Sequence, residues 1–160
     1  MNRTSIKATP FQIFQALLVF LLLWASSPSL DAQTKDTTTL TVRVTGARNA
    51  KGKIGVTLFQ DAQGFPDDTS KAIRQQSTEI DPKTMSAQIT FKDVPQGTFA
   101  VAVLHDENGN GKMDKNFVGI PKEGYGASNN PKKKRRAPTF DEAKFSLNSS
   151  EQSIEITLIY

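Results

Sequence analysis

The chain has 160 residues, with 20 lysines and arginines against 16 aspartates and glutamates, a formal net charge of +4 and no cysteine. Without cysteine the chain has no disulfide, no thiol nucleophile and no site for an N-terminal lipid anchor. The mild positive balance argues against a nucleic-acid-binding protein, because such proteins neutralise phosphates through strongly basic surfaces.

Residues 1–32 are predicted to be a signal peptide. Basic residues come first, and residues 13–25 (IFQALLVFLLLWA) form an apolar run. This run is short for a membrane span but fits the apolar region of a secretory signal. We place cleavage after Ala32, with Ser27 or Ser29 as alternatives, and an uncleaved anchor is the other interpretation. The rest of the chain is then expected to be exported, periplasmic or secreted, with no membrane span.

Alternation of apolar and polar residues with a period of two predicts a single β domain over residues 38–160. No stretch in this part has a helical stripe of useful length. Seven strands are expected in chain order: 39–46 and 53–59, paired as a first hairpin; 72–80; 86–94; 98–105; and 142–148 and 152–159, paired as a terminal hairpin.

The expected strand at residues 98–105 differs from the others because both of its faces are apolar. Phe99, Val101 and Val103 alternate with small or aliphatic residues, which is typical of a central strand covered on both sides. The pattern as a whole predicts an all-β fold, an antiparallel seven-stranded β-sandwich of Greek-key type. One long ordered loop, residues 106–140, is expected between the fifth and sixth strands. Phe91, Phe145 and Ile156 are expected beside the central strand.

The sequence DENGNGKMD, directly after this strand, matches most of a calcium-binding loop. Such loops place oxygen ligands at positions 1, 3, 5, 7 and 9 with glycine at position 6. Position 12, where a bidentate glutamate is usual, is here Phe117, so a true EF-hand is not expected. The predicted ligands of a weak Ca²⁺ site are Asp106, Asn108, Asn110, the carbonyl of Lys112, and Asp114, with Glu107 or Glu123 as a possible extra ligand.

Other interpretations of this loop remain open. Asparagine and glycine also form turns that bond to their own backbone and bind no cofactor. A hydrolase is a second possibility, with His105 paired to an adjacent carboxylate and a loop hydroxyl such as Ser128. We favour a structural role for His105, the single histidine, with a ring nitrogen bonded to the loop backbone. His105, Phe117 and Tyr125 are expected to anchor the loop over the small-residue face of the central strand.

A basic run lies within the long loop, between two prolines. A charge run of this kind is usually a solvated surface, and polyanion binding is the alternative function. The partners considered are an anionic lipid, a polysaccharide or a cell-envelope protein, and no nucleic acid is expected. The residues of this candidate patch are Lys132, Lys133, Lys134, Arg135 and Arg136.

The segment VPQGTFAVAVLHDENGNGKMDKNFVGIPKEGYGASNN, followed by APTFDEAKFSL, resembles the exported bacterial proteins of domain-of-unknown-function family 2141 (DUF2141). The resemblance spans about Leu40 to Tyr160 and implies an exported β-sandwich, with no activity attached. The strand PQGTFAVAV is also similar to strands of prealbumin-like and carboxypeptidase-regulatory-like sandwiches. Transthyretin-related hydroxyisourate hydrolases share that shape, but the several histidines and the YRGS terminus of those enzymes are absent here. The preferred hypothesis is an exported, non-enzymatic binding or structural module.

Overall fold

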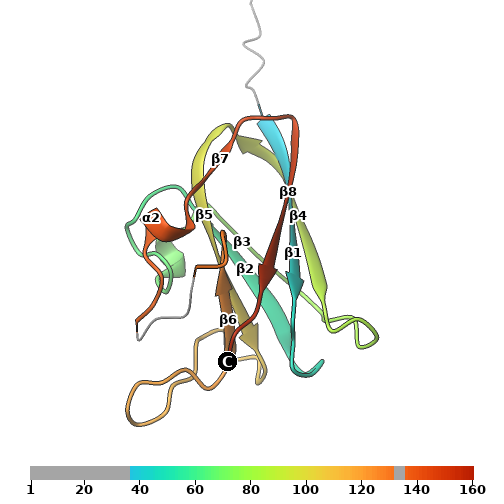
Figure 1. The fold of residues 1–160 in the computed structure, drawn as a ribbon, viewed down its shortest axis with the longest axis vertical. Helices are drawn as coiled ribbons and strands as arrows, with labels where there is room; N and C mark the ends of the chain where they lie inside the picture. The colour runs from blue at the N-terminus through green and yellow to red at the C-terminus, as the bar shows by residue number, and fades with distance from the viewer. Residues whose placement is uncertain (1–36, 132–135) are drawn as a thin grey trace, which may run out of the picture. The chain divides into compact units, whose positions relative to one another are not determined.

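The computed structural model describes residues 37–131 and 136–160, which form two β-sheets with two short helical segments beside them (Figure 1). Strands dominate, as the alternating sequence predicts. In chain order the elements are β1 (Thr37–Thr45), β2 (Lys53–Phe59), the 3-10 helix η1 (Thr69–Lys71), β3 (Arg74–Thr78), β4 (Ala87–Pro95), β5 (Gly97–Asp106), β6 (Gly124–Ala127), α2 (Phe140–Ala143), β7 (Phe145–Leu147) and β8 (Glu151–Thr157).

The strands divide into a three-stranded and a five-stranded sheet. The first has the order β4-β1-β8, and the second has the order β3-β2-β5-β6, with β7 paired to one end of β5. β1 and β8 are parallel, whereas the other strand pairs in the described part of the chain are antiparallel. The fold is therefore an all-β, two-sheet structure with a mixed sheet, and the prediction of seven antiparallel strands was wrong in these details.

Both predicted hairpins are also wrong. β1 lies in the first sheet and β2 in the second, and β7 pairs with β5 while β8 pairs with β1. In each case the connection crosses from one sheet to the other. Alternation identifies the buried face of a strand, but both sheets bury one face against the same core, so it does not identify the neighbouring strand.

The predicted long loop contains elements that the sequence did not reveal. β6 lies within residues 106–140 and pairs with β5 from Ala102 to His105, and α2 begins at Phe140. β6 has the sequence GYGA, whose two glycines hide the strand pattern. β6 brings the chain back along β5, so the loop between these strands is shorter than expected and is fixed at both ends.

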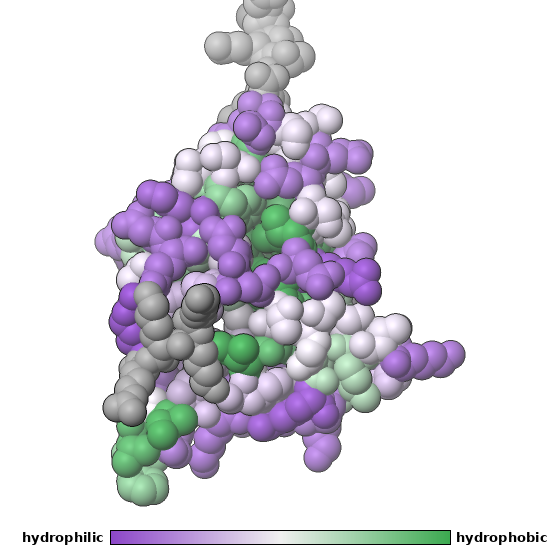
Figure 2. Space-filling view, in the orientation of Figure 1, coloured by the Kyte–Doolittle hydropathy of each residue, from purple (hydrophilic) through white to green (hydrophobic). Residues whose placement is uncertain are grey.

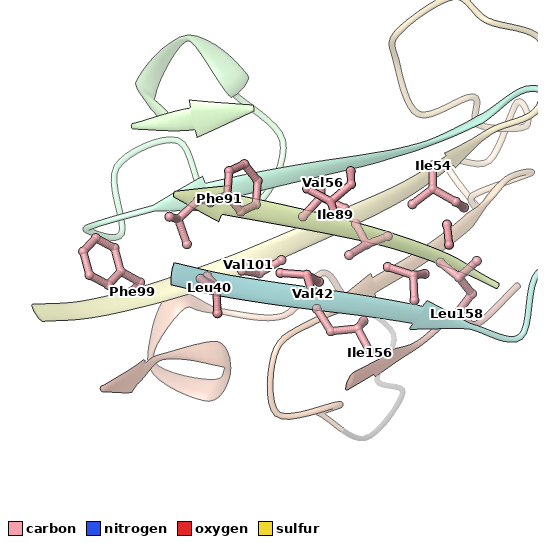
Figure 3. Close-up of a cluster of buried hydrophobic side chains, with 14 of the residues drawn as sticks. Leu40, Val42, Ile54, Val56, Ile89, Phe91, Phe99, Val101, Ile156 and Leu158 are labelled. Carbon is pink, nitrogen blue, oxygen red and sulfur yellow. The ribbon is translucent and has the colours of Figure 1, made fainter. Parts of the chain in front are cut away.

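The main core fills the space between the two sheets (Figure 3). Leu40 and Val42 come from the first sheet, and Ile54, Val56 and Val101 from the second, and each is at most 1% exposed. The expected neighbours of β5 are also in place: Phe91 and Ile156 are buried, and Phe145 packs against the cluster. Removal of these apolar side chains from water is the main force that holds the two sheets together.

β5 is central and covered on both faces, as predicted. Phe99, Val101 and Val103 face the main core, while Ala100 on the other face packs in a second cluster with Ala127 and Ala143. The helix α2 supplies Ala143, and Thr139 caps its start through a capping box with Glu142. Short side chains are required here because the helical turn lies directly against the strand. The aromatic cover of this face consists of Phe65 and Phe140, whose ring centroids are 6.0 Å apart.

Lys35–Tyr160 is a compact unit separate from Met1–Thr34. It contains both sheets and both apolar clusters, so its core is complete without the preceding segment. Its size of about 126 residues is sufficient for a domain to fold without disulfides. No helix within the described residues is long and apolar enough to span a membrane.

The central position of β5 predicts a sharp difference between two substitutions in that strand. Val101→Asp places an unpaired carboxylate in the core, at a cost of several kcal/mol against a typical stability of about 5 to 15 kcal/mol. We expect this variant of Lys35–Tyr160 to lose its cooperative thermal transition in circular dichroism. Thr98→Asp on the exposed part of the same strand is the control and should keep it. A folded Val101→Asp variant would contradict the central position of β5.

Candidate functional site

The acidic loop, residues 106–114, begins where β5 ends. The carboxylate of Asp106 accepts the hydrogen bonds that form its first turn. Asp106 Oδ1 accepts hydrogen bonds from the backbone N–H groups of Gly109 (2.8 Å) and Asn110 (3.1 Å), and Oδ2 accepts one from Gly111 (2.7 Å). Gly109 and Gly111 have φ angles of +76° and +74°, a region that glycine adopts without strain. The backbone is therefore wound tightly around one carboxylate.

The other three predicted ligand side chains are brought together on this loop. Asp114 accepts hydrogen bonds from both amide side chains, at 2.6 Å from Asn108 Nδ2 and 3.1 Å from Asn110 Nδ2. The amide oxygens accept backbone N–H groups two residues further on, Asn110 for Asn108 and Lys112 for Asn110. Asp106, Asn108, Asn110 and Asp114 thus form one hydrogen-bonded cluster, as the spacing predicts.

The two glutamates proposed as extra ligands have other contacts. Glu123 is only 4% exposed, and its carboxylate accepts the backbone N–H groups of Glu107 (2.9 Å) and Asp114 (3.0 Å). It therefore closes the base of the loop. The side chain of Glu107 forms an ion pair with Arg48 (2.6 Å) and accepts a hydrogen bond from Asn49 (3.0 Å). Burial raises the pKa of Glu107, but the bonds from Asn49 and Arg48 outweigh it and keep the pKa below its usual value.

The donor set of the loop suits a hard cation but is limited in charge. Within the described residues no three histidine, cysteine, aspartate or glutamate side chains are grouped to hold a metal ion. The loop instead combines two carboxylates with two amides. The amide N–H groups of Asn108 and Asn110 now place positive partial charge beside Asp114. Rotation of these amides would turn their oxygens toward the same point, where a cation could replace the N–H groups.

His105 lies under the loop, fully buried, and both of its ring nitrogens are bonded. Nε2 is 2.8 Å from the carbonyl oxygen of Lys51, and Nδ1 is 2.7 Å from the hydroxyl of Tyr160. Because a carbonyl only accepts, Nε2 carries the proton in the neutral ring, and Nδ1 accepts the hydroxyl proton of Tyr160. The backbone N–H of Arg48 then donates to the same hydroxyl oxygen at 2.9 Å. Both ring nitrogens thus have structural partners, but the backbone partner is Lys51 in the β1–β2 connection and not the acidic loop, where the sequence analysis expected it.

Tyr160 occupies a closely fitted position in this network. A Cβ atom at Gly124 would lie 2.5 Å from the tyrosine ring, so only glycine allows the ring to lie against β6. The Arg48 guanidinium lies over the same ring, 4.6 Å from its centroid. Burial raises the pKa of Tyr160 above its usual value of 10.0, which keeps the hydroxyl protonated and able to donate.

Ser128 and His105, the pair considered for a hydrolase, are apart in the structure. Ser128 lies beside Val101, four residues before His105 on β5, which corresponds to about 13 Å along a strand. The Ser128 hydroxyl is buried, accepts the backbone N–H of Val101 at 2.9 Å and donates to the carbonyl of Ala143 at 2.6 Å. It therefore fastens α2 to β5.

The prediction that Phe117 anchors the loop was wrong. Phe117 is 99% exposed, whereas Tyr125 is half-buried on β6 opposite Leu104. Phe65 and Phe140 cover Ala100 instead. Between residues 112–121 and the outer face of the second sheet lies a groove of about 940 Å³, whose lining includes Ala102, Leu104, Val118, Ile120 and Tyr125. Apolar character predicts burial, but Phe117 lies on the exposed side of this turn, outside the groove lining.

The basic run lies almost wholly outside the described residues. Lys132, Lys133, Lys134 and Arg135 belong to the undescribed part of the chain. Arg136 is described, and its guanidinium forms two hydrogen bonds to the carboxylate of Glu142, at 2.8 and 2.9 Å. These bonds raise the pKa of Arg136 and hold it against α2.

Sequence reasoning missed Arg48, Asn49, Lys51 and Tyr160. Lys51 and Tyr160 lie 54 and 55 residues from His105 along the chain. The sequence does hold one signal, the glycine pair of EGYG, because closely spaced glycines often mark a place where another group approaches the backbone. The identity of that group depends on the pairing of distant segments.

The network under the loop predicts a specific loss of stability for Tyr160→Phe. This change removes the hydroxyl and leaves Nδ1 of the buried His105 without its partner, which should cost about 1 to 3 kcal/mol. The free energy of unfolding in urea measures the loss. Tyr125→Phe is the matched control, because the Tyr125 hydroxyl has no hydrogen bond among the described residues, and this variant should stay close to wild type. Equal stability of both variants would refute the proposed network.

Comparison with protein families gives one match, which covers most of the domain. The model of the family described as "Uncharacterized protein conserved in bacteria (DUF2141)" matches residues 42–155. This range includes β1 to β8, apart from the first residues of β1 and the last residues of β8, and the whole acidic loop. Comparisons with curated proteins and with solved structures give no match. The matched range is most of the chain, so the protein belongs to the DUF2141 family.

Proposed function

We propose that this protein is an exported, non-enzymatic binding or structural module whose loop of residues 106–114 binds Ca²⁺ weakly. Export is inferred from the apolar run at residues 13–25 and the small residues that follow it. A non-enzymatic role is supported by His105, which uses both ring nitrogens in structural hydrogen bonds. The hydroxyl of Ser128 is occupied in the same way.

The observation that carries the calcium proposal is the hydrogen-bonded cluster of the loop. Asp106 already holds three backbone N–H groups, so the winding that a calcium loop needs is present before any ion binds. Both oxygens of Asp114 accept amide N–H groups, which a cation would replace with a full positive charge. The site lacks the bidentate glutamate of sensor loops, so its expected affinity lies in the weak range of extracellular modules, with a dissociation constant of about 0.1 to 1 mM.

Calcium should therefore raise the melting temperature of Lys35–Tyr160. At a calcium concentration about ten times the dissociation constant, binding adds about 1.4 kcal/mol, or several degrees for a domain of this size. Asp114→Asn keeps the shape of the side chain but removes its charge, and should abolish this rise. The measurement is the melting temperature in EDTA and in millimolar Ca²⁺.

Two control variants separate calcium binding from a general effect of calcium on the protein. Lys112→Ala should keep the rise, because only its carbonyl is a proposed ligand. Asp61→Asn makes the same chemical change at an exposed aspartate that also accepts a backbone N–H two residues further on, and should keep the rise too. Identical melting curves in EDTA and Ca²⁺, with no heat of binding in calorimetry, would disprove the calcium site.

A further inference from the structure

Residues 117–120, shortly after the acidic loop, form an exposed apolar turn, which we call the apolar tip. Phe117, Val118 and Ile120 are 99%, 60% and 58% exposed, and they are the exposed large hydrophobic residues of the described chain. Figure 2 shows an apolar group that protrudes from the edge of the molecule at the β5–β6 loop. Single exposed apolar residues are common on protein surfaces, but a contiguous exposed group usually marks an interaction site.

The tip is an ordered turn, and Asn116 holds it. Asn116 Oδ1 accepts the backbone N–H groups of Val118 (3.0 Å) and Ile120 (2.9 Å). The backbone of Asn116 also donates to the carbonyl of Ile120 and accepts from Gly119, both at 2.9 Å. Gly119 supplies the positive φ angle of +82° that the turn needs. The turn is thus fixed before binding, with Phe117 almost fully exposed and Val118 and Ile120 more than half exposed although they also line the groove, so the cost of ordering the backbone on binding is small.

Lysines lie on both sides of the tip in the sequence. Lys112, Lys115 and Lys122 are exposed, and residues 112–122 contain these three lysines and one aspartate, which gives a net charge of +2. Lys115 lies 3.9 Å from Asp67, an exposed and therefore weak contact. An exposed apolar group flanked by lysines is typical of a segment that enters the interface of an anionic membrane.

We propose that the tip docks on a membrane surface with anionic lipid headgroups. Phe117, Val118 and Ile120 would enter the boundary between headgroups and acyl chains, and the three lysines would lie at the headgroups. A bilayer accepts a convex apolar tip of this kind without a complementary pocket, whereas a protein partner would need one. Three apolar side chains give weak, reversible binding. This proposal goes beyond the calcium site and does not depend on it.

A single tryptophan can report on the tip. The only tryptophan of the sequence, Trp24, lies outside the compact unit Lys35–Tyr160. Phe117→Trp in that unit therefore introduces a single tryptophan, whose fluorescence reports on the tip. In EDTA we expect its fluorescence to shift to the blue with vesicles that contain phosphatidylglycerol, and to be quenched by brominated lipid. Lys83→Trp, on an exposed turn outside the β5–β6 loop, is the control and should show neither effect. The absence of both effects at Phe117→Trp would overturn the proposal.

Cosedimentation with the same vesicles tests the contributions of the apolar and basic residues. Phe117→Ser should weaken partitioning about tenfold or more. Lys112→Gln with Lys122→Gln should weaken it about fivefold for each lysine removed, and only on anionic vesicles. Lys83→Gln with Lys92→Gln removes the same charge elsewhere and should have little effect.

Two results would overturn the docking proposal, one in favour of another surface and one in favour of another partner. Unchanged binding of Phe117→Ser to anionic vesicles would assign the binding to another basic surface. A dimer in sedimentation velocity that Phe117→Ser dissociates would show that the tip contacts a second copy of the chain. The use of EDTA keeps these results separate from the calcium measurements, so that either proposal can fail alone.

Discussion

The buried ring of His105 imposes the constraint on which this end of the molecule depends. The imidazole of His105 is fully buried, so each ring nitrogen needs a hydrogen-bond partner. A buried polar atom without a partner lowers the free energy of unfolding by about 1 to 3 kcal/mol. The partners here are the carbonyl of Lys51 and the hydroxyl of Tyr160. The ring therefore joins three segments: the β1–β2 connection, which contains Lys51, the end of β5, and the residues after β8, which include Tyr160. These joined segments form the base of the acidic loop.

The acidic loop is built on this base. Glu107 follows His105 by two residues, and its ion pair with Arg48 connects the loop to the same β1–β2 connection that provides Lys51. Glu123 then closes the loop from the other side through the N–H groups of Glu107 and Asp114. The two glutamates that the sequence offered as metal ligands thus hold the frame, whereas Asp106, Asn108, Asn110 and Asp114 bond to one another and to the backbone of the loop.

Local patterns in the sequence predicted the faces of strands but not their partners. The two apolar faces of β5, from Phe99 to Leu104, indicated a central strand, and the spacing from Asp106 to Asp114 indicated a wound loop with grouped side chains. Pairing of β8 with β1 depends on contacts more than one hundred residues apart, and period two does not encode such contacts. Phe117 was placed wrongly because hydrophobicity alone does not distinguish a residue that anchors a loop from one that a turn holds outward.

Asp114 connects the two proposed sites physically. Its side chain belongs to the cation cluster, its N–H bonds to Glu123, and its carbonyl accepts the N–H of Lys122 at 2.8 Å, at the base of the apolar tip. A cation at Asp114 would add positive charge to a segment that already carries +2 and would stiffen the base of the tip. Both effects favour an anionic surface. Because coupling between two binding sites is reciprocal, an anionic surface at the tip must in turn favour the cation, so the two proposed sites would reinforce each other wherever both are filled.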